Sequence, residues 1–121
     1  MDKGQAYQSF WGSFGIPAYD ENTVPDEATL PYITYEEIEG NFEKSLYPSA
    51  SVWYRDTSWA AIEAKCKEIA AYIGYGGLTI PIDGGLMFIV QGSPFSYRAS
   101  DDKDDIRRKN INIAVEFFTA Y

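Results

Sequence analysis

The sequence predicts one α+β domain, in which a mostly antiparallel sheet of four to five strands carries helices on one face. The length of 121 residues lies in the usual single-domain range of about 100–150. Two stretches repeat apolar residues at spacings of three and four, and several shorter stretches alternate apolar and polar residues. Short connections favour antiparallel neighbours, so we expect the order α-β-β-α-β-β-β over residues 1–121.

The first segment, residues 5–14, has the apolar spacing of a short amphipathic helix that ends at Gly15. Its predicted buried stripe contains Ala6, Tyr7, Phe10, Trp11 and Phe14. Residues 16–31 follow with three prolines and four acidic residues, a composition that favours an extended loop.

Two strands are predicted next. Residues 32–39 consist mainly of strand-forming side chains, and Gly40 and Asn41 should end that strand. Residues 46–55 alternate between two faces, with Leu46, Pro48, Ala50, Val52 and Tyr54 on one of them. Because proline cannot donate a ladder hydrogen bond, Pro48 indicates an edge or a bulge.

The second predicted helix spans residues 58–73, with Thr57 or Ser58 as its cap and Gly74 as its stop. Asp83-Gly84-Gly85 then predicts a hairpin turn between strands 78–82 and 86–90. Residues 86–90 are apolar at every position, which is typical of a central strand covered on both faces. We expect Gly92-Ser93-Pro94 to end it.

A charged loop over residues 101–109 should precede a half-buried last strand that begins at Asn110. From these elements we expect a core that includes Ile62, Ile69, Ile73, Phe88, Val90, Ile111, Ile113 and Val115.

The composition excludes several kinds of chemistry. There is no His, and Cys66 is the single Cys, so His-dependent nucleophiles and Cys/His zinc sites are excluded. A net charge of −8 argues against an electrostatic nucleic-acid binder. No apolar run is long enough to span a bilayer, and no signal-peptide pattern follows Met1, so we expect a cytoplasmic chain. We expect no enzyme, no cofactor and no structural metal.

Four motifs have a functional and a simpler interpretation. Gly74–Gly77 could suggest a phosphate loop, but a helix-stop turn fits its place after a helix. Asp101–Asp105 lacks the spacing of a calcium loop and is typical of a solvated loop. The acids of residues 20–27 could supply a glycosidase pair, although their closeness in a loop does not support one. The aromatic side chains at Trp53, Tyr54 and Trp59 could stack on sugars or bases, or serve as packing and interface anchors.

Several segments together resemble the tail terminator, or tail completion, proteins of long-tailed bacteriophages. The similar segments follow the family's order along nearly the whole chain: Phe10-Trp11, Ile16–Pro25, Leu30–Glu36, Val52–Trp59 and Gly92–Arg98. In that family a Gln is common at the position of Tyr97.

The resemblance implies a structural subunit of a hexameric ring at the head-proximal end of the virion tail, assembled in the host cytoplasm. Such a ring caps the last layer of the tail tube protein, ends tube polymerisation and offers a joining surface to the head connector or stopper protein. DNA passes through the ring without specific binding, and the negative charge is compatible with that.

The loops 16–31 and 100–109 are the expected contact regions, because the domain core needs them least. Candidate contact residues for the subunit and tube interfaces are Tyr19, Asp20, Glu21, Asn22, Pro25, Trp53, Arg55, Trp59, Arg98, Arg107 and Arg108. Two alternatives stay open at this point. One is another connector or tail tube structural protein, and the other is a small carbohydrate-binding module or enzyme.

Overall fold

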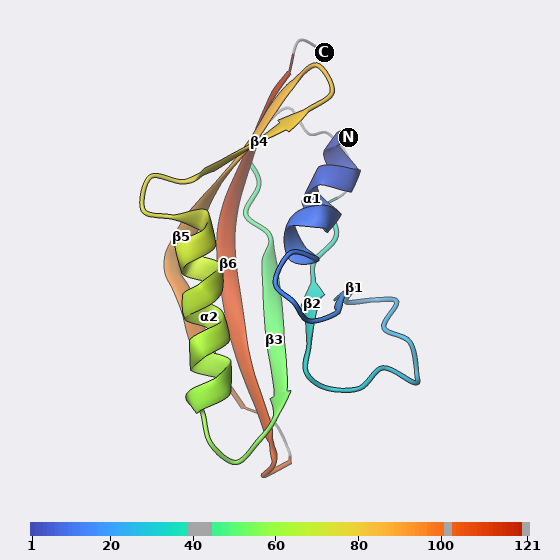
Figure 1. Cartoon of the computed structure of the whole chain (residues 1–121), viewed down its shortest axis with the longest axis vertical. Helices are drawn as coiled ribbons and strands as arrows, with labels where there is room; N and C mark the ends of the chain where they lie inside the picture. The colour runs from blue at the N-terminus through green and yellow to red at the C-terminus, as the bar shows by residue number, and fades with distance from the viewer. Residues whose placement is uncertain (39–44, 101–102, 120–121) are drawn as a thin grey trace.

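The computed structural model describes residues 1–38, 45–100 and 103–119, which form two helices and one six-stranded sheet (Figure 1). The elements in chain order are α1 (Lys3–Trp11), β1 (Ala18–Asp20), β2 (Tyr32–Tyr35), β3 (Ser49–Arg55), α2 (Ala60–Ile73), β4 (Leu78–Ile82), β5 (Gly85–Ala99) and β6 (Ile106–Thr119).

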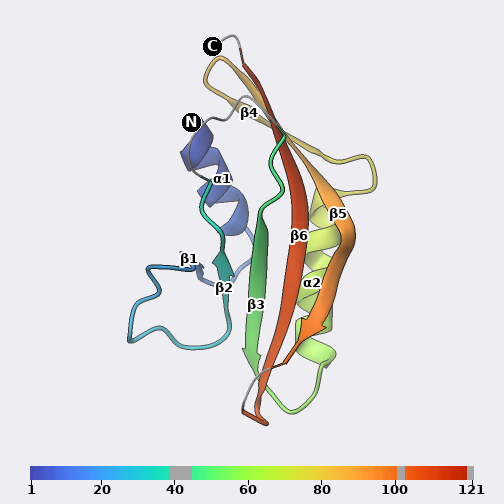
Figure 2. The ribbon, with the colours of Figure 1, turned by 180° about the vertical axis from the view of Figure 1, so that it is seen from behind.

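The sheet has the strand order β1-β2-β3-β6-β5-β4 and is built around the two long strands β5 and β6. Both helices lie on the same face: they are in front of the sheet in Figure 1 and behind it in Figure 2. The sheet curls around them, so its concave face holds the core and its other face points outward. We call these the helix face and the outer face.

The predicted fold class is wrong in strand number, pairing and element order. The sheet has six strands, it is mixed because β1 pairs with β2 in parallel, and the order is α-β-β-β-α-β-β-β. The difference arises at β1, a strand of three residues inside the segment predicted as a loop. Three residues are too few to show an alternating pattern, so pairing with β2 rather than local sequence defines this strand.

The core lies between the helices and the helix face. Helix α1 contributes Tyr7, Phe10 and Trp11, and Phe14 follows in the turn after it; all four are 2% exposed or less. The helix ends at Trp11, with Gly12 as its C-cap, and not at the predicted Gly15. An Asp2–Gln5 capping box fixes the start of this helix: the Gln5 N–H donates to Asp2 Oδ1 at 2.8 Å. Helix α2 buries Ile62, Cys66, Ile69 and Ile73, and ends at Gly74, whose φ is +79°.

Strand β5 corrects two expectations about the core. Residues 86–90 alternate between buried and half-buried positions, and Met87 and Ile89 are the fully buried ones. Phe88 and Val90 lie on the outer face, which no helix covers, so the prediction that both faces of this strand are covered is wrong. Ile62, Ile69, Ile73, Ile111, Ile113 and Val115 are buried as predicted.

The bounds of the strands also differ. Residues 92–94 do not end β5; a register shift between Gln91 and Ser96 absorbs them, and Asn112 Nδ2 donates to the Pro94 carbonyl there at 3.1 Å. The last strand begins at Ile106, inside the predicted charged loop, and β2 ends at Tyr35. The predicted strand end at Gly40 and Asn41, and the acids Asp101 and Asp102 of the charged loop, lie outside the described residues.

Candidate interaction surface

Three aromatic rings and a guanidinium form a row across the outer face, one from each of four neighbouring strands. The row consists of Tyr19 from β1, Tyr32 from β2, Trp53 from β3 and Arg108 from β6, and we call it the outer row. The ring centroids lie 5.7 Å apart from Tyr19 to Tyr32 and 6.4 Å apart from Tyr32 to Trp53. The Arg108 guanidinium lies 4.6 Å from the Trp53 ring centroid, a cation–π distance.

Strand register explains why these side chains meet. Tyr32 is opposite Trp53, and Trp53 is opposite Arg108. Their chain neighbours, such as Ile33, Val52 and Lys109, point to the helix face and are buried, so alternation places the row on the other side. All four members of the row are half-buried, and the row therefore remains partly open to a partner.

Polar side chains hold the row in position. Trp53 Nε1 donates to Thr34 Oγ1 at 2.9 Å, and Arg108 Nε donates to Ser51 Oγ at 3.1 Å. Ser51 Oγ donates in turn to Asn110 Oδ1 at 2.8 Å. Thr34 and Ser51 are buried, so these bonds are shielded from water and fix the orientation of the indole and the guanidinium.

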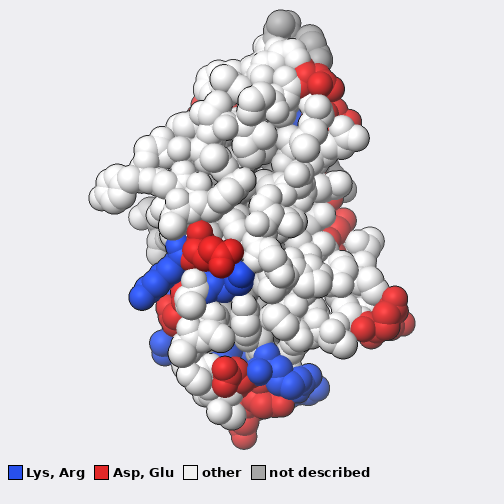
Figure 3. Space-filling model, viewed as in Figure 1, with Lys and Arg blue, Asp and Glu red and all other residues white. Residues whose placement is uncertain are grey.

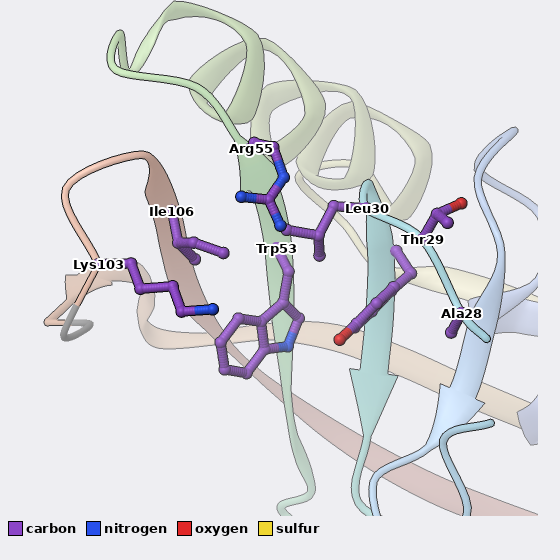
Figure 4. Close-up of a pocket in the computed structure, with 8 residues that line it drawn as sticks. Ala28, Thr29, Leu30, Trp53, Arg55, Lys103 and Ile106 are labelled. Atoms are coloured by element: carbon purple, nitrogen blue, oxygen red, sulfur yellow. The ribbon is translucent and has the colours of Figure 1, made fainter. Parts of the chain in front are cut away.

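A pocket of about 380 Å³ opens at one end of the outer row, between the two loops predicted to carry contacts (Figure 4). Figure 4 shows Trp53 at its centre, with the Lys103 side chain extending in the direction of the indole ring and Arg55 beside it. The pocket combines aromatic walls with two cations, a chemistry that suits a flat apolar group next to a carboxylate. Its lining residues are Ala28, Thr29, Leu30, Tyr32, Trp53, Arg55, Lys103 and Ile106.

An ion pair borders this pocket. Arg55 Nη1 lies 2.7 Å from Asp105 Oδ2, and this hydrogen bond holds the pKa of Asp105 below its usual range. The Asp56 N–H also donates to the Asp105 carbonyl at 2.7 Å. Both charged side chains are about half exposed, so we expect the pair to position the turn before β6 rather than to stabilise the fold.

A second charged group lies on the helix face, at the start of α2. We call it the Glu63 cluster; its members are Trp59, Glu63, Arg98 and Lys109. Glu63 accepts from Lys109 Nζ at 3.0 Å and from Arg98 Nε at 3.2 Å, and the bond from Lys109 above all lowers the pKa of Glu63. The Lys109 side chain is only 8% exposed, so its charge depends on Glu63 for compensation.

The Trp59 ring lies among arginines. The Arg98 guanidinium lies 4.4 Å from its centroid, and that of Arg107 lies at 5.3 Å. Arg107 also donates to the carbonyls of Thr57 and Asp104, at 2.8 and 2.9 Å. The Ala60 N–H donates to Ser58 Oγ at 3.0 Å, in the turn that precedes α2. The helix has Trp59 as its N-cap and no side-chain cap, so the predicted cap at Thr57 or Ser58 is wrong.

The structure thus divides the predicted contact residues among three places. Tyr19, Trp53 and Arg108 meet on the outer face, with Arg55 at the adjoining pocket. Trp59, Arg98 and Arg107 meet on the helix face. The remaining candidates lie in β1 or in the loop after it. The carboxylate of Asp20 accepts from the Asn22 N–H at 2.9 Å. Glu21 and Asn22 are exposed, and Pro25 is half-buried.

Sequence reasoning missed Tyr32, Glu63 and Lys109. Tyr32 was identifiable, because successive side chains of a strand point to opposite faces of the sheet. Tyr32 therefore lies on the face opposite to that of the buried Ile33. The positions of Glu63 and Lys109 were not identifiable, because their contact joins residues 46 positions apart.

The described residues offer little reactive chemistry. Among residues 1–38, 45–100 and 103–119, no group of three or more His, Cys, Asp or Glu side chains could hold a metal ion. The Cys66 thiol is 3% exposed, and burial raises its pKa to about 11. Neither helix in this part of the chain is long and apolar enough to cross a membrane.

Comparison with known proteins adds one structural likeness. No protein-family model and no curated protein sequence matches the chain. The chain does match one from a solved structure described as the virion of a native gene transfer agent particle, with a TM-score of 0.58 and 14% sequence identity. The match covers 91% of this chain and 82% of the other. At that identity it establishes a shared fold: this chain folds like a protein found in a virion particle.

Proposed function

We propose that the protein is a structural subunit of a phage-like virion, and that it is the tail terminator: a ring that caps the tail tube. The observation that carries the proposal is the match over 91% of the chain to a component of a gene transfer agent virion. The sequence resemblance to tail terminators points independently to the same kind of particle.

The site chemistry supports an assembly role over catalysis. The outer row and its pocket present partly exposed aromatic and cationic side chains, which are the residue types that anchor protein interfaces. Polar bonds already fix the Trp53 ring, so a partner would meet a preorganised surface at a low ordering cost. We assign the outer row and pocket to contact with a neighbouring virion protein.

A ring explains how one chain can stop a polymer. Each subunit of a ring meets its neighbours through two different surfaces, and rotation closes the set. A closed ring on the last layer of the tube leaves no surface for another tube subunit, while its far side is available to the head connector or stopper. In this proposal the ring is a homohexamer, its lumen lets DNA pass without base-specific contacts, and the protein is not an enzyme.

Native mass spectrometry together with assembly in vivo tests the proposal. The purified chain should appear as a closed hexamer, and a phage that lacks it should make overlong tails that do not join heads. Tails of normal length, joined to heads in its absence, would refute the terminator role. A helical filament of the purified chain would instead favour the alternative of a tube subunit, since a tube stacks openly.

A further inference from the structure

Part of the β5 edge has no partner strand. Strand β4 pairs with β5 only over Gly85–Ile89, whereas β5 runs on to Ala99. After the register shift, Ser96–Ala99 pair with β6 on one side and have no strand on the other side among the described residues. We call Ser96–Ala99 the open edge. An unpaired edge presents backbone N–H and C=O groups, which are a template for an added strand.

The other sheet margins are better protected. Strand β4 carries Pro81, which has no N–H to offer an added strand. Strand β1 is three residues long and turns away at once, where the Thr23 N–H donates to the Asp20 carbonyl at 3.0 Å. In the open edge, by contrast, Tyr97 is 46% exposed and the Arg98 side chain is 57% exposed.

The opposite margin of the sheet carries a projecting acidic segment. The loop of residues 21–31, which we call the acidic loop, leaves the body between β1 and β2 (Figures 1 and 2). The sequence has eight acidic residues and no Lys or Arg between Lys3 and Lys44. Figure 3 shows acidic side chains without cations at the outer tip of this loop, whereas Lys and Arg lie among Asp and Glu over α2 and the lower end of the sheet.

We propose that the open edge of one subunit receives the acidic loop of the next copy of this chain. Thr23 and its neighbours would lie beside Ser96–Ala99, and Arg98 would face the carboxylates of Asp26 and Glu27. This inference rests on the proposed ring, because it assigns the two different surfaces that such a ring needs.

The geometry of the sheet makes this contact intermolecular. Strands β1 and β5 are separated by β2, β3 and β6, which makes four inter-strand steps. At about 4.8 Å a step, the two margins lie roughly 19 Å apart and face opposite ways. Repetition of one contact between opposite margins turns each copy by the same angle, so the contact builds a closed ring where that rotation closes, and not an isolated dimer.

Charge gives the contact its direction. The acidic loop has no cation of its own, so two copies of it repel each other, and it is attracted to the Arg98 side of the neighbour. Backbone hydrogen bonds to the open edge would supply affinity that does not depend on salt, as in other cases of strand addition. Salt should therefore weaken the contact without abolishing it.

Cysteine cross-linking tests the contact directly in the full-length chain. We would mix Thr23→Cys and Tyr97→Cys single variants in equal amounts and add a short bismaleimide. The native Cys66 is 3% exposed, and the parent chain alone controls for its reaction. The matched control mixes Thr23→Cys with Tyr47→Cys, since Tyr47 is 78% exposed but lies outside the open edge.

We expect covalent dimers to form at least tenfold more in the 23/97 mixture than in the 23/47 mixture. If native mass spectrometry detects rings but the two mixtures cross-link equally, the assignment of the contact to the open edge is wrong. The terminator proposal would remain intact. A chain that forms no ring, in a phage whose tails are normal without it, would overturn both.

A charge exchange gives a second measurement that does not depend on cysteine reactivity. Arg98→Glu should reduce the ring fraction about tenfold, and Asp26→Arg with Glu27→Arg should restore it in the same chain. Arg98→Glu also disturbs the pair with Glu63 inside the chain, but reversal of the distant acidic loop cannot repair that pair. Loss of rings in Arg98→Glu without rescue by the loop reversal would contradict the proposal.

Discussion

Aromatic side chains have two different roles in the two halves of this molecule. Around α1, the rings of Tyr7, Phe10, Trp11 and Phe14 pack edge-to-face against one another and are almost completely buried. Across the outer row the rings have similar spacings, but each stays partly exposed and the row ends on an arginine.

The difference lies in what surrounds the rings. The α1 rings replace water with other apolar groups, so their burial contributes directly to folding. In the outer row, bonds to Thr34 and Ser51 orient the Trp53 indole and the Arg108 guanidinium, and the partly exposed rings remove less apolar area from water. The first group therefore determines the fold, and the second remains available to a partner.

Truncation of one tryptophan from each half should separate the two roles. Trp11→Ala should reduce the free energy of unfolding by about 3–5 kcal/mol, because Trp11 is 0% exposed. Trp53→Ala should cost less, about 1–2 kcal/mol, since the Trp53 side chain is only partly removed from water. Urea denaturation of the two variants measures both values. Equal losses would contradict the division.

Neighbouring residues of β5 offer the same comparison within one strand. Met87→Ala should cost about 2–5 kcal/mol, because Met87 is fully buried on the helix face. Phe88→Ala should cost only about 1–2 kcal/mol, although Phe is the larger side chain, because Phe88 lies on the outer face. Thermal denaturation of both variants provides the measurement. A larger loss in Phe88→Ala would show that another layer covers the outer face.

Phe88 also shows how far the sequence alone could lead. Both helices, the turn at Asp83-Gly84 and the alternation in β6 depend on local patterns, and they were predicted with small errors in their bounds. Residues 86–90 are apolar throughout, so the pattern contains no information about which face the helices cover. Phe88 and Val90 lie on the outer face because both helices pack against the other face of the sheet.

The candidate surface was predictable to a smaller extent. Tyr19, Trp53 and Arg108 were predicted as separate candidate contact residues, but the register of four strands is what brings them into one row. Arg107 donates to the carbonyls of Thr57 and Asp104, and Arg108 stacks on Trp53. Such long-range contacts have no signature in local spacing.

On the helix face, Glu63 should make stability depend on pH. Its pKa is lower in the folded chain than the value of about 4.3 for a free Glu, mainly because Lys109 donates to it. The stabilisation is therefore fully present above that unfolded value, and it is lost as the pH falls through the folded pKa. Glu63→Gln should cost about 1–3 kcal/mol at pH 7, because Lys109 keeps its buried charge without a counter-ion.

The matched control is Glu68→Gln. Glu68 pairs with Lys65 at 3.0 Å, but its side chain is 52% exposed, so the cost should stay below about 0.5 kcal/mol. Melting temperatures between pH 3 and pH 7 should converge for the parent chain and Glu63→Gln at the acidic end. A difference that stays constant over this range would mean that Glu63 acts through packing and not through its charge.

The smallest effect is expected at the pocket, where Arg55 pairs with Asp105 at 2.7 Å. Arg55→Gln should change the free energy of unfolding by less than about 1 kcal/mol, because both side chains are solvated and the Coulomb gain is screened. The same change removes one of the two cations that line the pocket, so binding of an acidic partner should suffer more than folding. The comparison of denaturation with tube capping therefore distinguishes a structural pair from a contact residue. If Arg55→Gln causes a large loss of stability but leaves tube capping normal, Arg55 stabilises the fold, as the α1 rings do, and is not a contact residue.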